Sequence, residues 1–262
     1  MKLPIVLTGA LALALAACSQ TASDDAGEVA MAPSLSTEDI NAAVANDARP
    51  EAARALDESR KPVEVLAFFG LEQGDDAADL ISGGGYWAEI LARAVGEDGS
   101  VTALEPEQFY NEEAWTALAQ REPGIALERY RFEAFERGEE RFDFAIMNLV
   151  YHDLYWESEE YDVPRSEPAD YLAGLYSMMR PGGIVGVIDH VGNAGDTRTT
   201  VEEYHRIDPQ VVRDDFAKAG FVLEAESDLL ANPDDTREIS VFDPSIRGKT
   251  DRVVMKFVKP AE

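Results

Sequence analysis

Residues 77–87 read Ala-Ala-Asp-Leu-Ile-Ser-Gly-Gly-Gly-Tyr-Trp, and this stretch decides the fold. An apolar strand over 77–81 runs into three glycines, and a helical pattern begins directly after them. Glycines permit positive φ angles and let a ligand touch the backbone. The start of the following helix offers unpaired N–H groups. The stretch therefore predicts a strand, a tight turn and a helix, with the turn facing a ligand.

An acidic residue at the end of the next strand strengthens this interpretation. The apolar run 100–104 ends in Glu105, about twenty residues after Gly85. A carboxylate in that position is placed to accept both hydroxyls of a ribose. The two features together predict a nucleoside-cofactor crevice at the carboxyl ends of the strands. NAD-binding Rossmann domains share this logic, so the spacing alone leaves the cofactor open.

The rest of the chain alternates apolar runs with helical stretches. We expect strands at 77–81, 100–104, 125–132, 142–148 and 184–189. We expect helices at 51–69 (interrupted at Pro62), 87–95, 107–120 and 169–179. This alternation predicts an α/β fold, with a parallel sheet covered by helices on both faces. A helix at 208–219 and two strands at 221–227 and 252–259 follow, and they predict a terminal antiparallel pair.

The turn resembles the Asp-x-Gly-x-Gly-x-Gly signature of class I S-adenosylmethionine-dependent methyltransferases. Asp79, Gly83 and Gly85 match it, and Ile81 replaces the first glycine. Residues 179–183 resemble the Leu-Lys-Pro-Gly-Gly turn of the same superfamily. More narrowly, the chain is similar to a bacterial group of often exported methyltransferases in five stretches, 66–70, 83–87, 151–153, 189–190 and 205–208.

This resemblance extends over residues 62–260 and implies both a fold and a cofactor. The implied fold is a doubly wound, mostly parallel seven-stranded sheet of the Rossmann-like methyltransferase type, with a terminal antiparallel strand. The implied cofactor is S-adenosyl-L-methionine, lying over the glycine turn. The cofactor-binding residues that we expect are Asp79, Ser82, Gly83, Gly84, Gly85, Tyr86, Glu105, Glu133 and Asn148.

The loops after the fourth and fifth strands carry the candidate catalytic residues. In this architecture His152 and Asp153 face the transferred methyl group, and either is expected to take a proton from the acceptor. His190, at the end of the fifth strand, is the third candidate. With His205, all histidines of the chain are expected at one rim, as a proton relay or a hydrogen-bonded scaffold. A metal site with Asp153 or Asp189 is the third interpretation, but no His-x-x-x-His spacing supports it and we predict no metal.

The first 18 residues resemble a bacterial lipoprotein signal peptide. A positive start precedes an apolar run over 3–17 that is too short to span a bilayer comfortably. Leu15-Ala16-Ala17-Cys18 resembles a lipobox, and Cys18, the only cysteine of the chain, is the expected lipidation site. A plain signal peptide with an incidental cysteine is the alternative. We expect an exported, lipid-anchored protein at the cell envelope, on the outer membrane or facing the periplasm, and Ser19 favours the outer membrane.

The remaining organisation and the partners follow from composition. Residues 19–49 are expected to be a flexible polar tether, and residues 50–262 the methyltransferase-like domain. The net charge of −28 argues against a nucleic-acid partner, because such a surface repels phosphate backbones.

Three functions remain possible, and the sequence supports them in the following order. The first is a methyltransferase acting on a small molecule or an envelope component. The second is a non-catalytic nucleoside-binding module on the same fold, because an exported domain is separated from the cytosolic cofactor pool. The third is an NAD-type oxidoreductase, which the late antiparallel strands and the glycine spacing disfavour.

Overall fold

A seven-stranded sheet organises the part of the chain that the computed structural model describes, Met1 and residues 35–261. The leader and Cys18 lie outside the described residues. The strands follow the order β3-β2-β1-β4-β5-β7-β6. Their bounds are β1 Asp76–Leu80, β2 Ser100–Pro106, β3 Ile125–Tyr130, β4 Phe142–Asn148, β5 Met179–His190, β6 Val222–Ser227 and β7 Arg252–Val258.

The strand directions confirm the predicted fold class. Strands β3, β2, β1, β4 and β5 pair in parallel, and β7 runs antiparallel to both β5 and β6. The late pair therefore extends the parallel sheet, with β7 inserted next to β5 and β6 at the edge. The order reverses between β1 and β4, and the crevice of a doubly wound sheet forms at that point.

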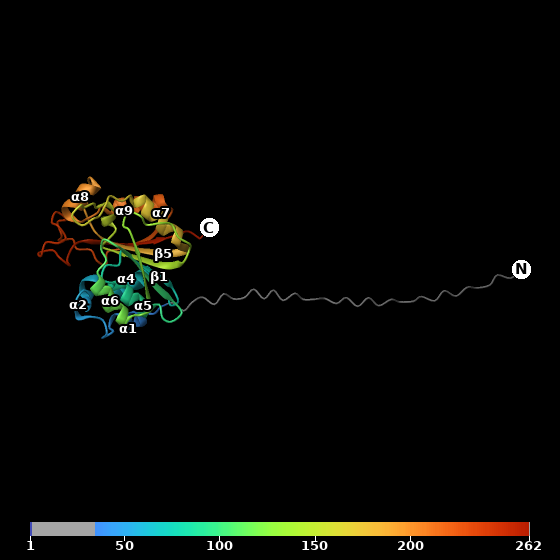
Figure 1. Cartoon of the computed structure of the whole chain (residues 1–262). Helices are drawn as coiled ribbons and strands as arrows, with labels where there is room; N and C mark the ends of the chain where they lie inside the picture. Colours follow the sequence, from blue (N-terminus) through green and yellow to red (C-terminus); the bar gives the residue numbers. More distant parts are fainter. Residues whose placement is uncertain (2–34, 262) are drawn as a thin grey trace. The chain divides into compact units, whose positions relative to one another are not determined.

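Helices cover both faces of the sheet, as Figure 1 shows. One face carries α1 Thr37–Val44, α4 Pro62–Phe69, α5 Tyr86–Ala94 and α6 Glu112–Arg121. The other carries α7 Pro168–Met178 and α9 Pro209–Ala219. The central strands β1 and β4 are buried because both faces are covered, and this explains their continuous apolar runs.

The predicted tether needs correction at its end, because residues 37–44 form helix α1. Ser36 and Asp39 make a capping box at its start, and Ile40 and Ala43 are buried against the core. The short apolar face of this helix is too weak a periodic signal to stand out in an alanine-rich stretch. The folded part of the chain therefore includes residues before Pro50.

The boundaries of the helices differ from the expected ones in three places. The predicted helix 51–69 is divided into α2 Glu51–Arg54, α3 Asp57–Arg60 and α4, with Lys61 in a left-handed conformation at the break. The helix α6 begins at Glu112, where Asn111 caps it, rather than at Glu107. The predicted loop after β5 contains the helix α8 Thr197–Tyr204. Within the described residues, no helix has the length and apolarity needed to cross a membrane.

Candidate functional site

The glycine turn between β1 and α5 has the backbone geometry that its residues predict. Gly83 and Gly85 have φ angles of 59° and 77°. A Cβ at Gly83 or Gly84 would meet no atom within 4 Å, so the backbone there is open to a ligand. A Cβ at Gly85 would lie 2.3 Å from Leu118 Cδ2, so this glycine lets α6 pack against the turn. Two glycines therefore face the crevice and the third serves packing.

Asp79 ties the turn to the helix behind it. Its side chain is 2% exposed, and Oδ2 accepts hydrogen bonds from the Ser82 hydroxyl and, at 2.9 Å, from the Ala88 N–H. Burial raises the pKa of Asp79 to about 7. Asp79 and Ser82 therefore stabilise the turn through hydrogen bonds made within the protein.

Glu105 lies under the same turn and is incompletely satisfied. Its side chain is fully buried, and Oε2 accepts a 2.7 Å hydrogen bond from the Gly83 N–H. Its Oε1 is buried without a hydrogen-bond partner among the described residues. Burial raises the pKa of Glu105 to about 8. A buried acceptor without a donor costs on the order of 1–3 kcal/mol, so this atom fits a hydroxyl supplied by a ligand.

A cavity of about 460 Å³ lies over the turn, and such a volume suits a small-molecule ligand. The predicted cofactor residues on its lining are Asp79, Ser82, Gly83, Gly84, Tyr86 and Asn148. Gly85, Glu105 and Glu133 are not on this lining, and Glu105 reaches it only through its hydrogen bond with Gly83. Glu133 lies apart from the turn. It is exposed and accepts hydrogen bonds from Arg131 and Gln108 instead.

Residues 49–60, which we call the N-terminal segment, contact Tyr86 and close one side of this cavity. The Tyr86 hydroxyl donates to Asp57 Oδ1 at 2.7 Å, and Arg49 donates to both Asp57 oxygens at 2.8 Å. Arg60 lies over the Tyr86 ring, with its Cζ 4.2 Å from the ring centre, and lines the cavity. Within residues 35–261, no carboxylate pairs with Arg60. No pattern in the sequence singles out Arg60, since only the folded position of α3 beside the turn brings it to the cavity.

His152 is a buried, charged histidine after β4. Its ring is nearly inaccessible, and Nδ1 lies 2.7 Å from Asp189 Oδ1. The backbone N–H of His152 donates a hydrogen bond to Asp189 Oδ2 at 2.8 Å. Burial lowers the pKa of His152, but the negative charges of Asp189 and Asp153 outweigh it and raise this pKa to about 9. His152 lowers the pKa of Asp189 in turn, against the effect of burial. The pair is therefore an imidazolium and a carboxylate at neutral pH.

Asp153 and His190 both lie close to His152, and they differ in charge state at neutral pH. Asp153 Oδ1 lies 3.4 Å from His152 Nε2, and the Asp153 side chain keeps 17% exposure. Burial raises the pKa of Asp153 to about 6, so it is mainly ionised at pH 7. His190 Nδ1 lies 2.7 Å from Thr250 Oγ1, and burial lowers the pKa of His190 to about 3, which keeps it neutral.

The histidines of the two loops come together in space. The ring of His152 lies 5.9 Å from that of His190 and 5.6 Å from that of His205, measured between ring centres. His205 also packs against Trp156, at 5.3 Å. Despite this proximity, no group of three His, Cys, Asp or Glu residues in the described ranges is arranged to hold a metal ion.

Comparisons with known proteins identify the fold. No family model matches the chain, and no curated protein matches its sequence. Among solved structures, a SAM-dependent methyltransferase from Aquifex aeolicus is 19% identical, with a TM-score of 0.55, over 80% of this chain and 98% of that one.

Two further structures share the fold. A methyltransferase from Mesorhizobium loti is 17% identical, with a TM-score of 0.52, over 78% of this chain and 99% of that one. The 1,6-didemethyltoxoflavin-N1-methyltransferase of Burkholderia thailandensis, solved with S-adenosylhomocysteine, is 18% identical, with a TM-score of 0.50, over 80% and 79% of the chains. The chain thus has the fold of class I S-adenosylmethionine-dependent methyltransferases.

Proposed function

We propose that this chain is an S-adenosylmethionine-dependent methyltransferase acting on a small molecule or an envelope component. The observation that carries the proposal is the buried, unpartnered Oε1 of Glu105 beneath an open glycine turn. A ribose supplies a donor for that atom, and the turn leaves room for the nucleoside against the backbone. The shared fold with methyltransferases of known structure supports the same cofactor.

The residues around the cavity fit the rest of the cofactor. Arg60, without a carboxylate partner among the described residues, would bind the carboxylate of the methionine portion. Asp79 and Glu105 are acids in a buried setting, and a positively charged ligand favours their ionised forms. When bound, S-adenosylmethionine supplies an electrophilic methyl group on a sulfonium centre. The protein then has to align an acceptor with it and remove a proton.

Asp153 is the group best suited to take that proton. At neutral pH it is ionised and partly exposed, whereas His152 already holds its proton against Asp189. The positive charge of His152, whose Nε2 lies 3.4 Å from Asp153 Oδ1, then stabilises the negative charge of Asp153. His190 is neutral, and its Nδ1 is engaged with Thr250, so it borders the acceptor as an uncharged polar group.

Calorimetric titration of the full-length protein tests the cofactor. We expect S-adenosylhomocysteine to bind the wild type and NAD not to bind. Arg60→Met should weaken binding by about 10- to 100-fold, as expected for a lost hydrogen bond to a charged group. Arg54→Met is the matched control, because Arg54 lies on the same segment and pairs with the exposed Asp47. Equal losses in both variants, or no binding by the wild type, would contradict the proposal.

Export and lipid anchoring are proposed from the leader. Residues 1–18, with Cys18 in a lipobox-like position, motivate an envelope location. Mass spectrometry of the mature N-terminus tests it, and an unmodified Cys18 would contradict it. Export also motivates the alternative of a non-catalytic nucleoside-binding module. That alternative gains if the protein binds S-adenosylmethionine but transfers no labelled methyl group to any envelope extract.

A further inference from the structure

A second cavity, of about 580 Å³, is lined by side chains from residues 55–61, 229–232 and 247–252, and it shares Leu56 with the cavity over the glycine turn. We call it the basic cavity, because Lys61, Arg247, Lys249 and Arg252 line it. Within the described chain, Glu58 is the one acidic residue on this lining. The chain has 51 acidic and only 23 basic side chains, so this local excess of positive charge runs against the character of the whole molecule.

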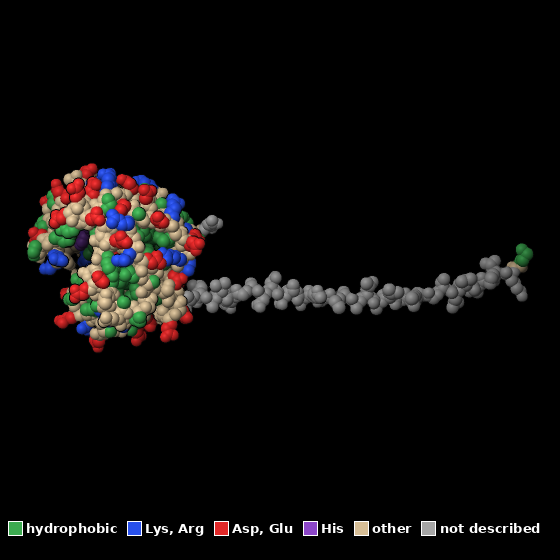
Figure 2. All heavy atoms as spheres, in the orientation of Figure 1, with side chains coloured by type: hydrophobic (Ala, Val, Ile, Leu, Met, Phe, Trp, Pro, Cys, Tyr) green, Lys and Arg blue, Asp and Glu red, His purple; other side chains and the backbone are tan. Residues whose placement is uncertain are grey.

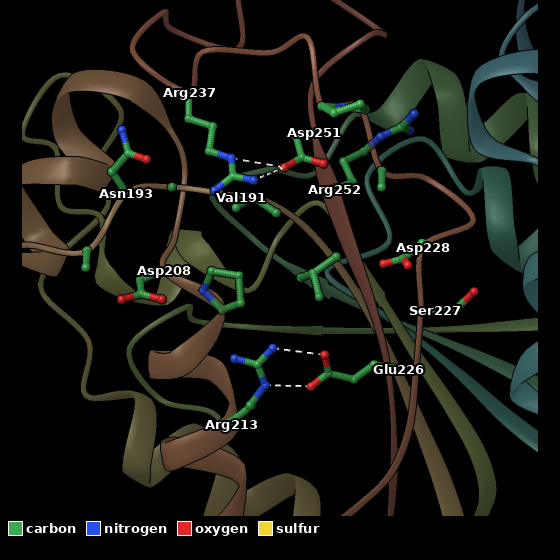
Figure 3. A pocket seen from close by; sticks show the side chains of 16 residues that line it. Val191, Asn193, Asp208, Arg213, Glu226, Ser227, Asp228, Arg237, Asp251 and Arg252 are labelled. Atoms are coloured by element: carbon green, nitrogen blue, oxygen red, sulfur yellow. Dashed lines mark hydrogen bonds and ion pairs between the residues drawn. The ribbon is translucent and has the colours of Figure 1, made fainter.

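Arg252 is the feature that distinguishes the basic cavity from a patch of surface cations. The residue is 8% exposed, its Nε is buried without a hydrogen-bond partner among the described residues, and no described carboxylate forms an ion pair with its guanidinium. The adjacent Asp251 pairs with Arg237 instead. Figure 3 draws a neighbouring cavity that Arg252 also lines, and it shows Arg252 extending away from that pair. A buried charge without a partner is costly, so such a group fits a site that an anion completes.

Further positive charges lie near Arg252. Burial and the nearby Arg60 both lower the pKa of Arg252, to about 10, and the guanidinium still carries its charge at neutral pH. Arg247 and Lys249 are exposed and make no side-chain ion pair with other described residues, so they add positive potential at the entrance. Lys61 donates to the Leu229 carbonyl oxygen at 2.8 Å, which holds it at the rim.

The basic cavity adjoins the candidate catalytic loops. Arg252, at the start of β7, pairs in register with His190 on β5. Thr250 lines the cavity and lies 2.7 Å, through Oγ1, from His190 Nδ1. Leu56 lines both this cavity and the cofactor cavity. The side chain of Thr250 thus lies between the basic cavity and His190, and Leu56 lies between the basic cavity and the cavity over the glycine turn.

We propose that the methyl acceptor is a small molecule with an oxyanion group, a carboxylate or a phosphate, which Arg252 binds through its guanidinium. The identification of this molecule as the methyl acceptor rests on the proposed methyltransferase function, whereas the anion site itself does not. Arg is suited to such groups because its planar fork donates two parallel hydrogen bonds to them. Arg247 and Lys249 would draw the anion toward the cavity.

Thermal unfolding of the full-length protein with inorganic phosphate or succinate tests the site, with chloride at matched ionic strength as reference. In the wild type, one or both probes should raise the unfolding temperature, and which of them acts separates phosphate from carboxylate acceptors. Arg252→Met should abolish the rise, with an affinity loss of at least about tenfold. The same variant should unfold at a higher temperature without a probe, because it removes an unpaired buried charge.

Arg213→Met is the matched control, since Arg213 pairs with Glu226 outside the basic cavity. It should keep the full response to the probe. An equal response in Arg252→Met and the wild type, or no response of the wild type to either probe, would overturn the inference. Titration with S-adenosylhomocysteine separates the two proposals. If the cofactor product binds and the anions do not, only this inference fails, whereas missing cofactor binding defeats the proposed function whatever the anions do.

Discussion

Single residues at the glycine turn show where this chain departs from the signature it resembles. Ile81 takes a left-handed backbone conformation, with a φ of 52°, at the position where the signature has its first glycine. A β-branched residue is a genuine outlier in that region. The Ile81 side chain is 5% exposed and packs in the core, so burial compensates for the backbone strain.

Replacing Ile81 by two smaller residues separates these effects. Ile81→Ala and Ile81→Gly both lose the buried side chain, but only glycine relieves the left-handed strain. We therefore expect Ile81→Gly to be about 1 kcal/mol more stable than Ile81→Ala, the reverse of the usual order. Urea unfolding measures the difference. A more stable alanine variant would show that the backbone at residue 81 is not held at positive φ.

Glu105 predicts a pH dependence of both stability and cofactor affinity. Burial raises the pKa of Glu105 in the folded protein from its ordinary value of 4.5 to about 8. Its protonation therefore favours the folded state at low pH, and this contribution is lost as pH rises between those values. A ribose that donates to Glu105 favours the ionised form, so affinity for S-adenosylhomocysteine should rise from pH 6 to pH 8. Calorimetry checks this, and the rise should be much smaller in Glu105→Gln. A flat profile in the wild type would argue against contact between Glu105 and the ribose.

At the scale of elements, the glycine turn is held between β1, α5 and α6. Gly83 faces open space, whereas Gly85 contacts α6 through Leu118. The same residue type thus serves a ligand at one position and helix packing at the other. This division is invisible in the run Gly83-Gly84-Gly85, because it depends on where α6 lies.

Alanine at these two glycines should therefore have unequal effects. Gly83→Ala costs about 1–2 kcal/mol of stability through backbone strain alone. Gly85→Ala adds the overlap with Leu118, which costs about 1–3 kcal/mol more. Denaturant unfolding measures both losses. Leu118→Ala should cost less in the Gly85→Ala background than in the wild type, because there it also removes the overlap. Equal losses at the two glycines would contradict this packing.

The ends of β4 and β5 are joined by the ion pair of His152 and Asp189. Because the pKa of His152 in the folded protein is raised from its ordinary value of 6.5 to about 9, the charge on His152 stabilises the protein fully below pH 6.5 and loses this effect as pH rises toward 9. Asp189→Asn should lower the His152 pKa below 6.5 by NMR titration and cost about 3–5 kcal/mol at neutral pH. Glu226→Gln, which breaks a half-exposed pair, should cost about 1 kcal/mol or less. Similar costs in both variants would contradict the role assigned to burial.

The whole molecule combines a well-covered core with a strongly acidic surface. Figure 2 shows Asp and Glu side chains spread over the visible face of the domain, with fewer Lys and Arg side chains between them. The net charge of −28 disfavours the compact state through self-repulsion. Arg60 and Arg252, which form no ion pair with a described carboxylate, lie at two cavities that share Leu56.

Salt should therefore stabilise this protein. Raising NaCl from 0.1 M to 1 M shortens the screening length from about 10 Å to about 3 Å, so the urea midpoint should increase. Arg252→Met should show the same increase, because general screening does not depend on one anion site. An unchanged or lower midpoint in 1 M NaCl would contradict a destabilising role of the net charge.

The elements were predictable to different extents, for physical reasons. The central strands β1, β2 and β4 are apolar runs that burial on both faces requires, and they were predicted closely. The helix α1 was missed because only two of its residues, Ile40 and Ala43, are buried, which leaves a short apolar pattern.

The sequence by itself determined the α/β class, the antiparallel end of the sheet and the pairing of the glycine turn with Glu105. These follow from local periodicity and from spacing along the chain. Only the tertiary structure decided that His152 is charged and His190 neutral, that Glu105 keeps an unpartnered oxygen, and that Arg60 and Arg252 lack carboxylate partners among the described residues. Protonation and pairing depend on burial and on distances between segments far apart in the chain, and the order of residues does not record either.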